Sequence, residues 1–244
     1  MTTPLDVTIA AADGTSTPRT IMVRRSYNLG SATRDAAEAV HHQEEVAKSG
    51  VRIAFDIPAP RIYPIAPWAL TSAGVIGVHG PRTSGEVEFL IFVDDGGEMF
   101  IGVGSDHTDR DLERTSILWS KQSCPNILAP VLWRWADVKG HWDRCELWSD
   151  LDGEPYQRCS VAIFRDPEEL VALVRDRADV PEAGFMIFSG TYVSVTGELA
   201  FGKRWNFGLV DPVLGRSLEH GYDVELLLDE VHDGFRVPLH VEGA

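Results

Sequence analysis

The stretch from Gly85 to Val93 constrains the fold of this chain more than any other segment. Apolar residues recur at every second position, which predicts a β-strand. One face would be wholly apolar, formed by Val87, Phe89, Ile91 and Val93, and the other would carry Glu86, Glu88, Leu90 and Phe92. A strand this apolar is expected to be covered on both sides, so the two carboxylates would lie about 7 Å apart in a half-buried place.

Two buried anions so close together would repel each other. One of them must take up a proton or find a cation, and a divalent metal ion would serve both carboxylates. The alternative is that Glu86 and Glu88 lie at an exposed strand end, beside arginines such as Arg82.

The residues that follow this strand predict a β-hairpin with a third carboxylate. The loop Asp94-Asp95-Gly96-Gly97 is a strong turn signal, and residues 98–103 return as a strand. A three-residue loop would place Asp106 opposite Glu86, whereas a two-residue loop would turn Asp106 to the other face. Either register brings Asp106 to the Glu86 end, where three carboxylates would suit Mg2+ or Mn2+. Alternatively, Asp106 is the N-cap of a helix that begins in the acid-rich segment after it.

A second candidate pair lies on a helix predicted for residues 33–48. His42 and Glu45 are three positions apart, so they would be neighbours on one helix surface. The glutamate could orient the imidazole as a general base. His41 and Glu44 have the same spacing, and the whole segment could instead be a solvated polar face.

The remaining pattern predicts many strands and few helices. Short strands are expected around turns such as Asp13-Gly14 and Asp152-Gly153, and a helix is expected over residues 166–174. The fold class is therefore α+β with a mixed or rolled sheet. A proline-rich segment over residues 57–67 divides an N-terminal unit, 1–65, from a main body, 66–244.

Three further features have both a functional and a structural interpretation. Lys121 could reach an anionic substrate or be an ordinary surface lysine. The turn at Gly190-Thr191 could bind an anion through its N–H groups. His141-Trp142-Asp143 could be a second catalytic or metal-binding pair, although core packing is the favoured interpretation.

Composition narrows the classes of partner. The 244 residues have a net charge of −15, which disfavours binding to nucleic acid but leaves room for small anionic substrates in a pocket with local cations. No run of apolar residues is long enough for a membrane span, and no signal peptide is evident. Three cysteines without a Cys-x-x-Cys pair favour reduced thiols, so we expect a cytoplasmic protein.

Taken in order, five motifs resemble those of the fumarylacetoacetate hydrolase superfamily over residues 30 to 228. They are Glu86-x-Glu88, Asp106-x-Thr108-x-Arg110-Asp111, Lys121 before Ser123-Cys124-Pro125, Asp152-Gly153-Glu154-x-x-Gln157 and Gly190-Thr191.

This resemblance implies a fold and a set of site residues. The fold would be a rolled mixed β-sheet with a few flanking helices, commonly assembled as a homodimer. The metal ligands would be Glu86, Glu88 and Asp106, binding Mg2+ first and Mn2+ or Ca2+ as alternatives. The catalytic residues would be His42, Glu45 and Lys121, and the substrate would meet Arg110, Gln157, Gly190 and Thr191.

The implied activity is metal-dependent hydrolysis of a C–C bond in a small 2-oxo or 1,3-dicarbonyl acid of the acylpyruvate type. Relatives with this scaffold also decarboxylate, isomerise or dehydrate 2-oxo acids, and a non-catalytic acid-binding or structural homologue is a further alternative. The chain departs from the family around the substrate: Glu113 replaces a glutamine, and Tyr192 replaces the proline after Gly-Thr.

Overall fold

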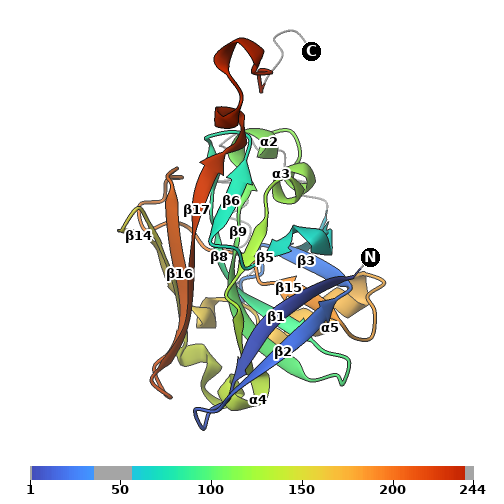
Figure 1. The fold of residues 1–244 in the computed structure, drawn as a ribbon. Helices are drawn as coiled ribbons and strands as arrows, with labels where there is room; N and C mark the ends of the chain where they lie inside the picture. The colour runs from blue at the N-terminus through green and yellow to red at the C-terminus, as the bar shows by residue number, and fades with distance from the viewer. Residues whose placement is uncertain (1, 36–56, 240–244) are drawn as a thin grey trace.

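The computed structural model describes residues 2–35 and 57–239 and contains two main β-sheets (Figure 1). The larger sheet has ten strands in the order β2-β1-β12-β9-β8-β15-β3-β4, with β11 beside β9 and β5 beside β11. Its strands are Thr3–Ala10 (β1), Ser16–Val23 (β2), Arg25–Gly30 (β3), Arg61–Ile65 (β4), Leu70–Thr71 (β5), Val87–Val93 (β8), Met99–Asp106 (β9), Asn126–Leu128 (β11), Val131–Arg134 (β12) and Phe185–Phe188 (β15).

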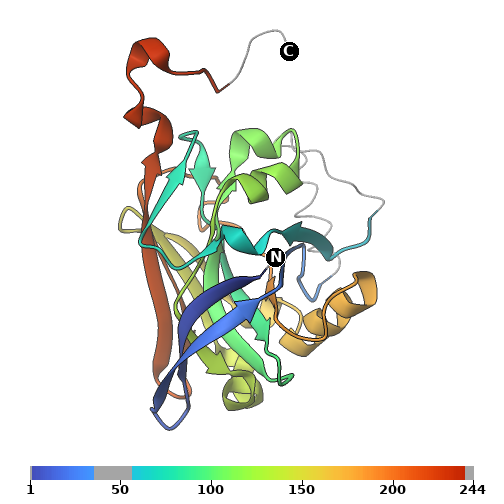
Figure 2. The same ribbon diagram turned by 45° about the vertical axis from the view of Figure 1, so that its right-hand side comes forward.

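The smaller sheet has five strands in the order β14-β13-β16-β17-β6 and stands beside the larger one (Figure 2). Its strands are Val75–Val78 (β6), Glu146–Leu151 (β13), Glu154–Ser160 (β14), Arg204–Asp211 (β16) and Arg216–Leu226 (β17). A separate short pair joins Thr83–Ser84 (β7) to Thr108–Asp109 (β10).

Helices are few and short in the described part of the chain. The α-helices are Arg110–Glu113 (α2), Ile117–Ser123 (α3), Trp135–Val138 (α4) and Pro167–Arg177 (α5). The 3-10 helices are Pro67–Ala69 (η1), Lys139–Arg144 (η2), Val161–Ile163 (η3), Leu227–Glu230 (η4) and Asp233–Phe235 (η5). Parallel and antiparallel pairs coexist in both sheets, so the predicted α+β fold with a curled mixed sheet is confirmed.

The central hairpin has the register of the three-residue loop. Glu88 pairs with Gly104, and the Asp94 N–H donates to the Glu98 carbonyl oxygen at 3.0 Å. The side chain of Asp94 accepts further hydrogen bonds from the N–H groups of Gly96 and Glu98, at 2.9 and 2.8 Å, which fixes the turn. Every residue of β8 is buried, because β9 and β15 flank it and side chains cover both of its faces.

Strands from both sides of residue 65 share the larger sheet, since β3 pairs with β15 and β1 pairs with β12. The division into an N-terminal unit and a main body stays a prediction. His42 and Glu45 lie outside the described residues, as does most of the helix predicted for residues 33–48.

The main core contains large aromatic side chains and includes residues of both sheets. Phe89, on β8, is fully buried and meets Trp142 and Phe164 edge to face, with ring centroids 5.1 and 5.7 Å apart. In the segment His141-Trp142-Asp143, the structure favours core packing over a catalytic or metal-binding pair, because His141 and Asp143 have separate partners. Trp142 is core, while His141 contacts Asp211 at 2.9 Å and Asp143 pairs with Arg34.

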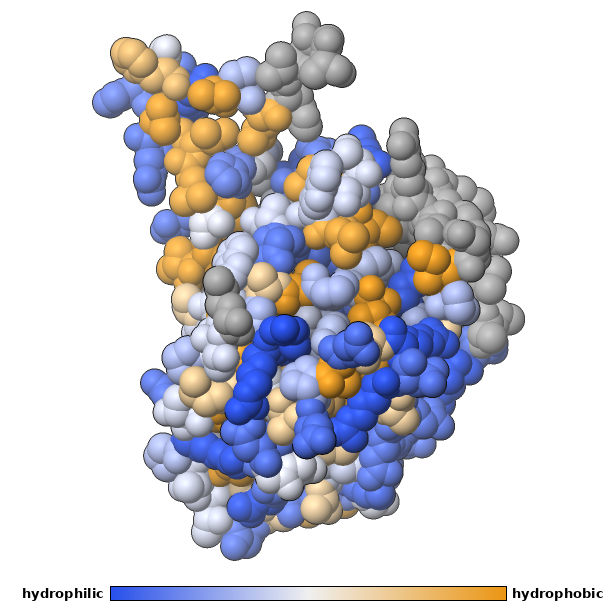
Figure 3. All heavy atoms as spheres, turned by 90° about the vertical axis from the view of Figure 1, so that its right-hand side faces the viewer, coloured by the Kyte–Doolittle hydropathy of each residue, from blue (hydrophilic) through white to orange (hydrophobic). Residues whose placement is uncertain are grey.

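The C-terminal segment after β17 projects from the body of the molecule and carries exposed apolar side chains (Figure 3). Phe235 is 81% exposed and Val237 is 72% exposed. None of the described helices is long and apolar enough to cross a membrane. Cys124, Cys145 and Cys159 are all free thiols.

We predict that Phe89→Ala will lower the free energy of unfolding by about 3–5 kcal/mol, because it leaves a cavity between three packed rings. Chemical denaturation measures the change. Trp119→Ala is the control, because Trp119 is an aromatic residue that is 63% exposed, and it should stay within about 0.5 kcal/mol of the unmodified protein. Equal effects of the two substitutions would contradict this description of the core.

Candidate metal centre

Three carboxylates converge at one end of the β8–β9 hairpin. Glu86, Glu88 and Asp106 each offer one oxygen, and these oxygens lie within 4.8 Å of one another. The register explains the convergence, because Glu88 pairs with Gly104 and the Asp106 N–H donates to the Glu86 carbonyl oxygen at 3.0 Å. The structure therefore brings the three predicted metal ligands together.

The segment after β9 does not use Asp106 as a helix cap. Helix α2 is capped by Asp109, whose side chain accepts hydrogen bonds from the N–H groups of Asp111 and Leu112, both at 3.0 Å. Because Asp109 performs this local role, the carboxylate of Asp106 stays in the cluster. Its side chain is completely buried.

Two cations hold these carboxylates in place. Lys121, near the end of α3, contacts Glu86 at 3.2 Å and forms a close ion pair with Asp106. Arg110, at the start of α2, donates from Nη2 to Glu86 at 2.8 Å and from Nη1 to Glu113 at 3.0 Å. Its Nε donates to the hydroxyl of Ser84 at 2.7 Å, so all three of its nitrogens have partners.

The electrostatic environment differs sharply between neighbouring carboxylates. Burial alone would raise the pKa of Glu86, but Arg110 and Lys121 outweigh it and lower that pKa to about 2. For Glu88, burial and then the charge of Asp106 raise the pKa well above its usual value. Burial likewise raises the pKa of Asp106, with Lys121 opposing the effect. Ionised Glu88 and Asp106 are thus disfavoured unless a further cation lies beside them.

A divalent cation fits this cluster. Oδ1 of Asp106 is buried and has no hydrogen-bond partner among the described residues. Arg110 and Lys121 pair with Glu86, Asp106 and Glu113, and Glu88 adds a fourth carboxylate to the group. Full ionisation of these six side chains would give them a net charge of minus two. Carboxylate oxygens are the donors that Mg2+, Mn2+ and Ca2+ prefer.

The turn at Gly190-Thr191 supports the carboxylates directly. The Gly190 N–H donates to Glu88 Oε2 at 2.8 Å, and Gly190 has a φ of +83°. A Cβ at Gly190 would lie 2.8 Å from the carbonyl oxygen of Leu29, so only glycine fits there. The Thr191 hydroxyl donates to the Val87 carbonyl oxygen at 3.0 Å.

Gln157, on β14, ties this turn to β8. Its Oε1 accepts from the Val87 N–H at 2.9 Å, while its Nε2 donates to Thr191 Oγ1 at 2.8 Å and to the Tyr192 carbonyl oxygen at 2.5 Å. Both ends of the amide are therefore engaged by the protein. The predicted contact of Gln157 with a substrate stays a prediction.

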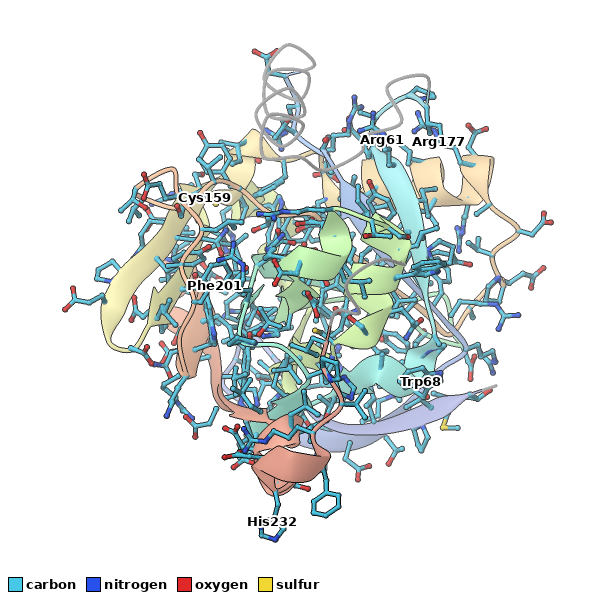
Figure 4. The ribbon with its side chains drawn as sticks, turned by 90° about the horizontal axis from the view of Figure 1, so that it is seen from above. Arg61, Trp68, Cys159, Arg177, Phe201 and His232 are labelled. Atoms are coloured by element: carbon cyan, nitrogen blue, oxygen red, sulfur yellow. The ribbon has the colours of Figure 1, made fainter. Side chains whose placement is uncertain are left out.

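A cavity of about 240 Å³ opens over the carboxylates. Its lining includes Arg61, Tyr63 and Tyr156, which the sequence did not single out, because no local pattern marks residues that meet only through tertiary folding. The Lys121 ammonium lies 6.0 Å from the centre of the Tyr63 ring. Figure 4 shows Arg61 beside Arg177, whose guanidinium donates to the Pro60 carbonyl oxygen at 2.7 Å.

Comparisons with known proteins place the fold. The family described as "Protein of unknown function (DUF2848)" matches residues 29–222. No curated protein matches the chain in sequence. Among solved structures, fumarylpyruvate hydrolase from Pseudomonas aeruginosa, in complex with Mn2+ and pyruvate, aligns with a TM-score of 0.61 and 17% identity over 91% of this chain and 96% of that chain.

Two further structures share the fold. One is 2-keto-3-deoxyarabinonate dehydratase, with a TM-score of 0.61 and 16% identity over 83% of this chain and 74% of that chain. The other is a protein assigned to the fumarylacetoacetate hydrolase family from Yersinia pestis, with a TM-score of 0.59 and 14% identity over 83% of this chain and 94% of that chain.

Charge removal at two neighbouring ligands should change stability in opposite directions. In metal-free protein, Glu88→Gln should raise the free energy of unfolding by about 1 kcal/mol or more, because it removes a carboxylate that is penalised first by burial and then by repulsion from Asp106. Glu86→Gln should lower it by up to about 3–5 kcal/mol, because it removes the buried carboxylate that Arg110 and Lys121 share and leaves them with Glu113 and Asp106 alone. Chemical denaturation in a chelator measures both, and changes of the same sign would contradict this account of the cluster.

Proposed function

Since the chain belongs to the DUF2848 family and has the fold of fumarylacetoacetate hydrolase family proteins, we propose that it is a metal-dependent hydrolase that cleaves a C–C bond in a small 2-oxo or 1,3-dicarbonyl acid. The carboxylate cluster of Glu86, Glu88 and Asp106 beneath a small cavity is the observation that carries this proposal.

The three carboxylates would hold the metal ion, with Mg2+ first and Mn2+ or Ca2+ as alternatives. The bound ion would supply Lewis acidity that stabilises negative charge developing on the oxygens of a 2-oxo acid. Arg110 keeps Glu86 ionised, and the Gly190 N–H orients Glu88. The Mn2+ and pyruvate in the Pseudomonas aeruginosa structure support this assignment.

A small anionic acid suits the cavity. The volume of the cavity is about 240 Å³, which is below the range of about 300–1,000 Å³ that is typical of sites for drug-sized ligands, so the cavity suits a smaller molecule. Lys121 lies at the boundary between the carboxylates and the cavity, where its ammonium would meet a substrate carboxylate or a developing oxyanion. Arg110 and the Gly190-Thr191 turn would act mainly by fixing the cluster, since their polar groups already have protein partners.

In the proposed hydrolysis, water adds to the distal carbonyl carbon and the C–C bond breaks. The carbon left on the 2-oxo acid then takes up a proton, so the products are a carboxylic acid and a 2-oxo acid. His42, oriented by Glu45, would take the proton from water. This assignment comes from the family resemblance, and His41 with Glu44 is the alternative pair.

Dehydration is the second candidate activity. The fold matches 2-keto-3-deoxyarabinonate dehydratase as well as it matches fumarylpyruvate hydrolase, with a TM-score of 0.61 in each case. Both reactions, like decarboxylation and isomerisation, develop negative charge beside a 2-oxo group. A non-catalytic acid binder would keep the metal centre but turn over no substrate.

Metal binding and turnover should depend on the cluster. We predict that Glu88→Gln and Asp106→Asn will each weaken Mn2+ binding by more than about 100-fold, which exceeds the usual effect of changes outside the ligands. Isothermal titration with Mn2+ measures the affinity, and absorbance of the enol form measures turnover of an acylpyruvate panel. Full-strength binding in both variants would contradict the ligand assignment.

His42→Ala should abolish acylpyruvate hydrolysis while Mn2+ affinity stays nearly unchanged, and His41→Ala is the matched control. Loss of activity in His41→Ala alone would assign the base to the neighbouring pair. Turnover of 2-keto-3-deoxy sugar acids without acylpyruvate hydrolysis would favour a dehydratase, and Mn2+ binding without any turnover would favour the acid binder.

We also propose a homodimer, which the projecting C-terminal segment supports. Phe235 and Val237 would gain from burial against a second copy of the chain. Replacing both with serine should weaken self-association about tenfold or more, as measured by light scattering over a dilution series. Leu214→Ser, at a site with 42% exposure, is the control. A monomeric unmodified protein would contradict the dimer, and an unaffected dimer would exclude this segment from the interface.

A further inference from the structure

A buried tyrosine of the smaller sheet contacts the chain on both sides of a candidate metal ligand. Tyr222, on β17, is completely buried. Its hydroxyl lies 2.9 Å from Oγ of Ser105 and 2.8 Å from Nδ1 of His107. These two residues immediately precede and follow Asp106 in the sequence. A phenol hydroxyl can donate one hydrogen bond and accept another, so both contacts can be satisfied together.

The alternation of an extended chain gives these contacts a consequence for Asp106. Side chains at successive positions point to opposite faces, so Ser105 and His107 point away from the face on which Asp106 lies. The Tyr222 hydroxyl contacts Ser105 and His107 on the face opposite Asp106, and these contacts fix the backbone that carries Asp106. The contact continues to β7, because Nε2 of His107 lies 2.8 Å from Oγ1 of Thr83.

The same group of side chains packs against the second ligand-bearing segment. A Cβ on Gly85 would lie 2.7 Å from both Oγ of Ser105 and the Tyr222 hydroxyl. The hydroxyl groups of Ser105 and Tyr222 therefore pack closely against the backbone at Gly85, directly before Glu86. Trp205 closes the other side, with its ring edge to face against His107 at a centroid distance of 6.1 Å.

We infer that Tyr222 is a positioning residue for the metal centre, and that its hydroxyl holds Asp106 and Glu86 at the separation a divalent cation needs. This inference rests on the metal site proposed above. Tyr222 is too deep to meet a substrate, since it does not line the cavity, and so it acts through the ligands.

Tyr222→Phe is the direct test, because phenylalanine keeps the packed ring and removes both contacts of the hydroxyl. The expected result is Mn2+ binding about 10–100-fold weaker than in the unmodified protein, as is usual when a partner of a metal ligand is lost. Electron paramagnetic resonance of free Mn2+ measures the affinity without any substrate. Tyr27→Phe is the matched control, because Tyr27 is also buried and its hydroxyl has no hydrogen-bond partner among the described residues; its Mn2+ affinity should not change.

Ser105→Ala provides a second variant that removes one contact and leaves the tyrosine in place. It should weaken Mn2+ binding less than Tyr222→Phe does. The double variant should bind Mn2+ no more weakly than Tyr222→Phe alone, because Ser105 acts through the same hydroxyl. Tyr222→Phe could also lower the melting temperature. Equal Mn2+ affinities of Tyr222→Phe and the double variant would support the inference in that case too.

The outcomes separate this inference from the proposed function. Unchanged Mn2+ affinity in both Tyr222→Phe and Ser105→Ala would overturn the positioning role alone. Full additivity of the two substitutions would overturn the shared action through one hydroxyl. Absence of Mn2+ binding by the unmodified protein would overturn the metal site itself, and the inference with it.

Discussion

The rest of the site depends on a concentration of negative charge that the fold buries at the end of one hairpin. Glu86, Glu88 and Asp106 lie within reach of a single ion, and Asp106 is wholly removed from solvent. Burying unpaired carboxylates is costly, so the chain surrounds them with cations and N–H donors from distant segments. Lys121 and Arg110 offset part of the charge, and the remainder would attract the divalent cation proposed above.

Local sequence was sufficient to predict the hairpin, because strand alternation and a turn with two glycines are short-range signals. The predicted loop placed Asp106 near Glu86, at the open end of the hairpin, in either of the two possible registers. The structure then selected the three-residue loop, in which Glu88 pairs with Gly104. The residue pattern already predicted a mixed or rolled sheet and a possible metal site at the carboxylates, and the family resemblance then narrowed both to one superfamily.

The partners of these carboxylates could not be predicted in the same way, because they meet across large separations in sequence. Tyr222 reaches His107 from the other sheet, 115 positions away, and nothing local marks the pair. The substrate contact predicted for Gln157 stays a prediction, and the structure adds that its amide binds Val87 and Thr191. Polar side chains near a cavity often hold the surrounding backbone in place, and their hydrogen-bond partners identify those that do so.

This separation between the centre and the walls of the cavity explains how one fold can serve several reactions. The three carboxylates belong to β8, β9 and the residue before β8, and their geometry is fixed by strand pairing and buried contacts. The walls come from other segments, such as Tyr63 on β4 and Tyr192 after the glycine turn. The family resemblance predicts a proline at the position of Tyr192, so an aromatic ring stands at the cavity wall in place of the expected small rigid one. Such a change alters the shape of the cavity without disturbing the carboxylates. If the proposed function holds, the choice of substrate would therefore lie with the wall segments rather than with the carboxylate cluster.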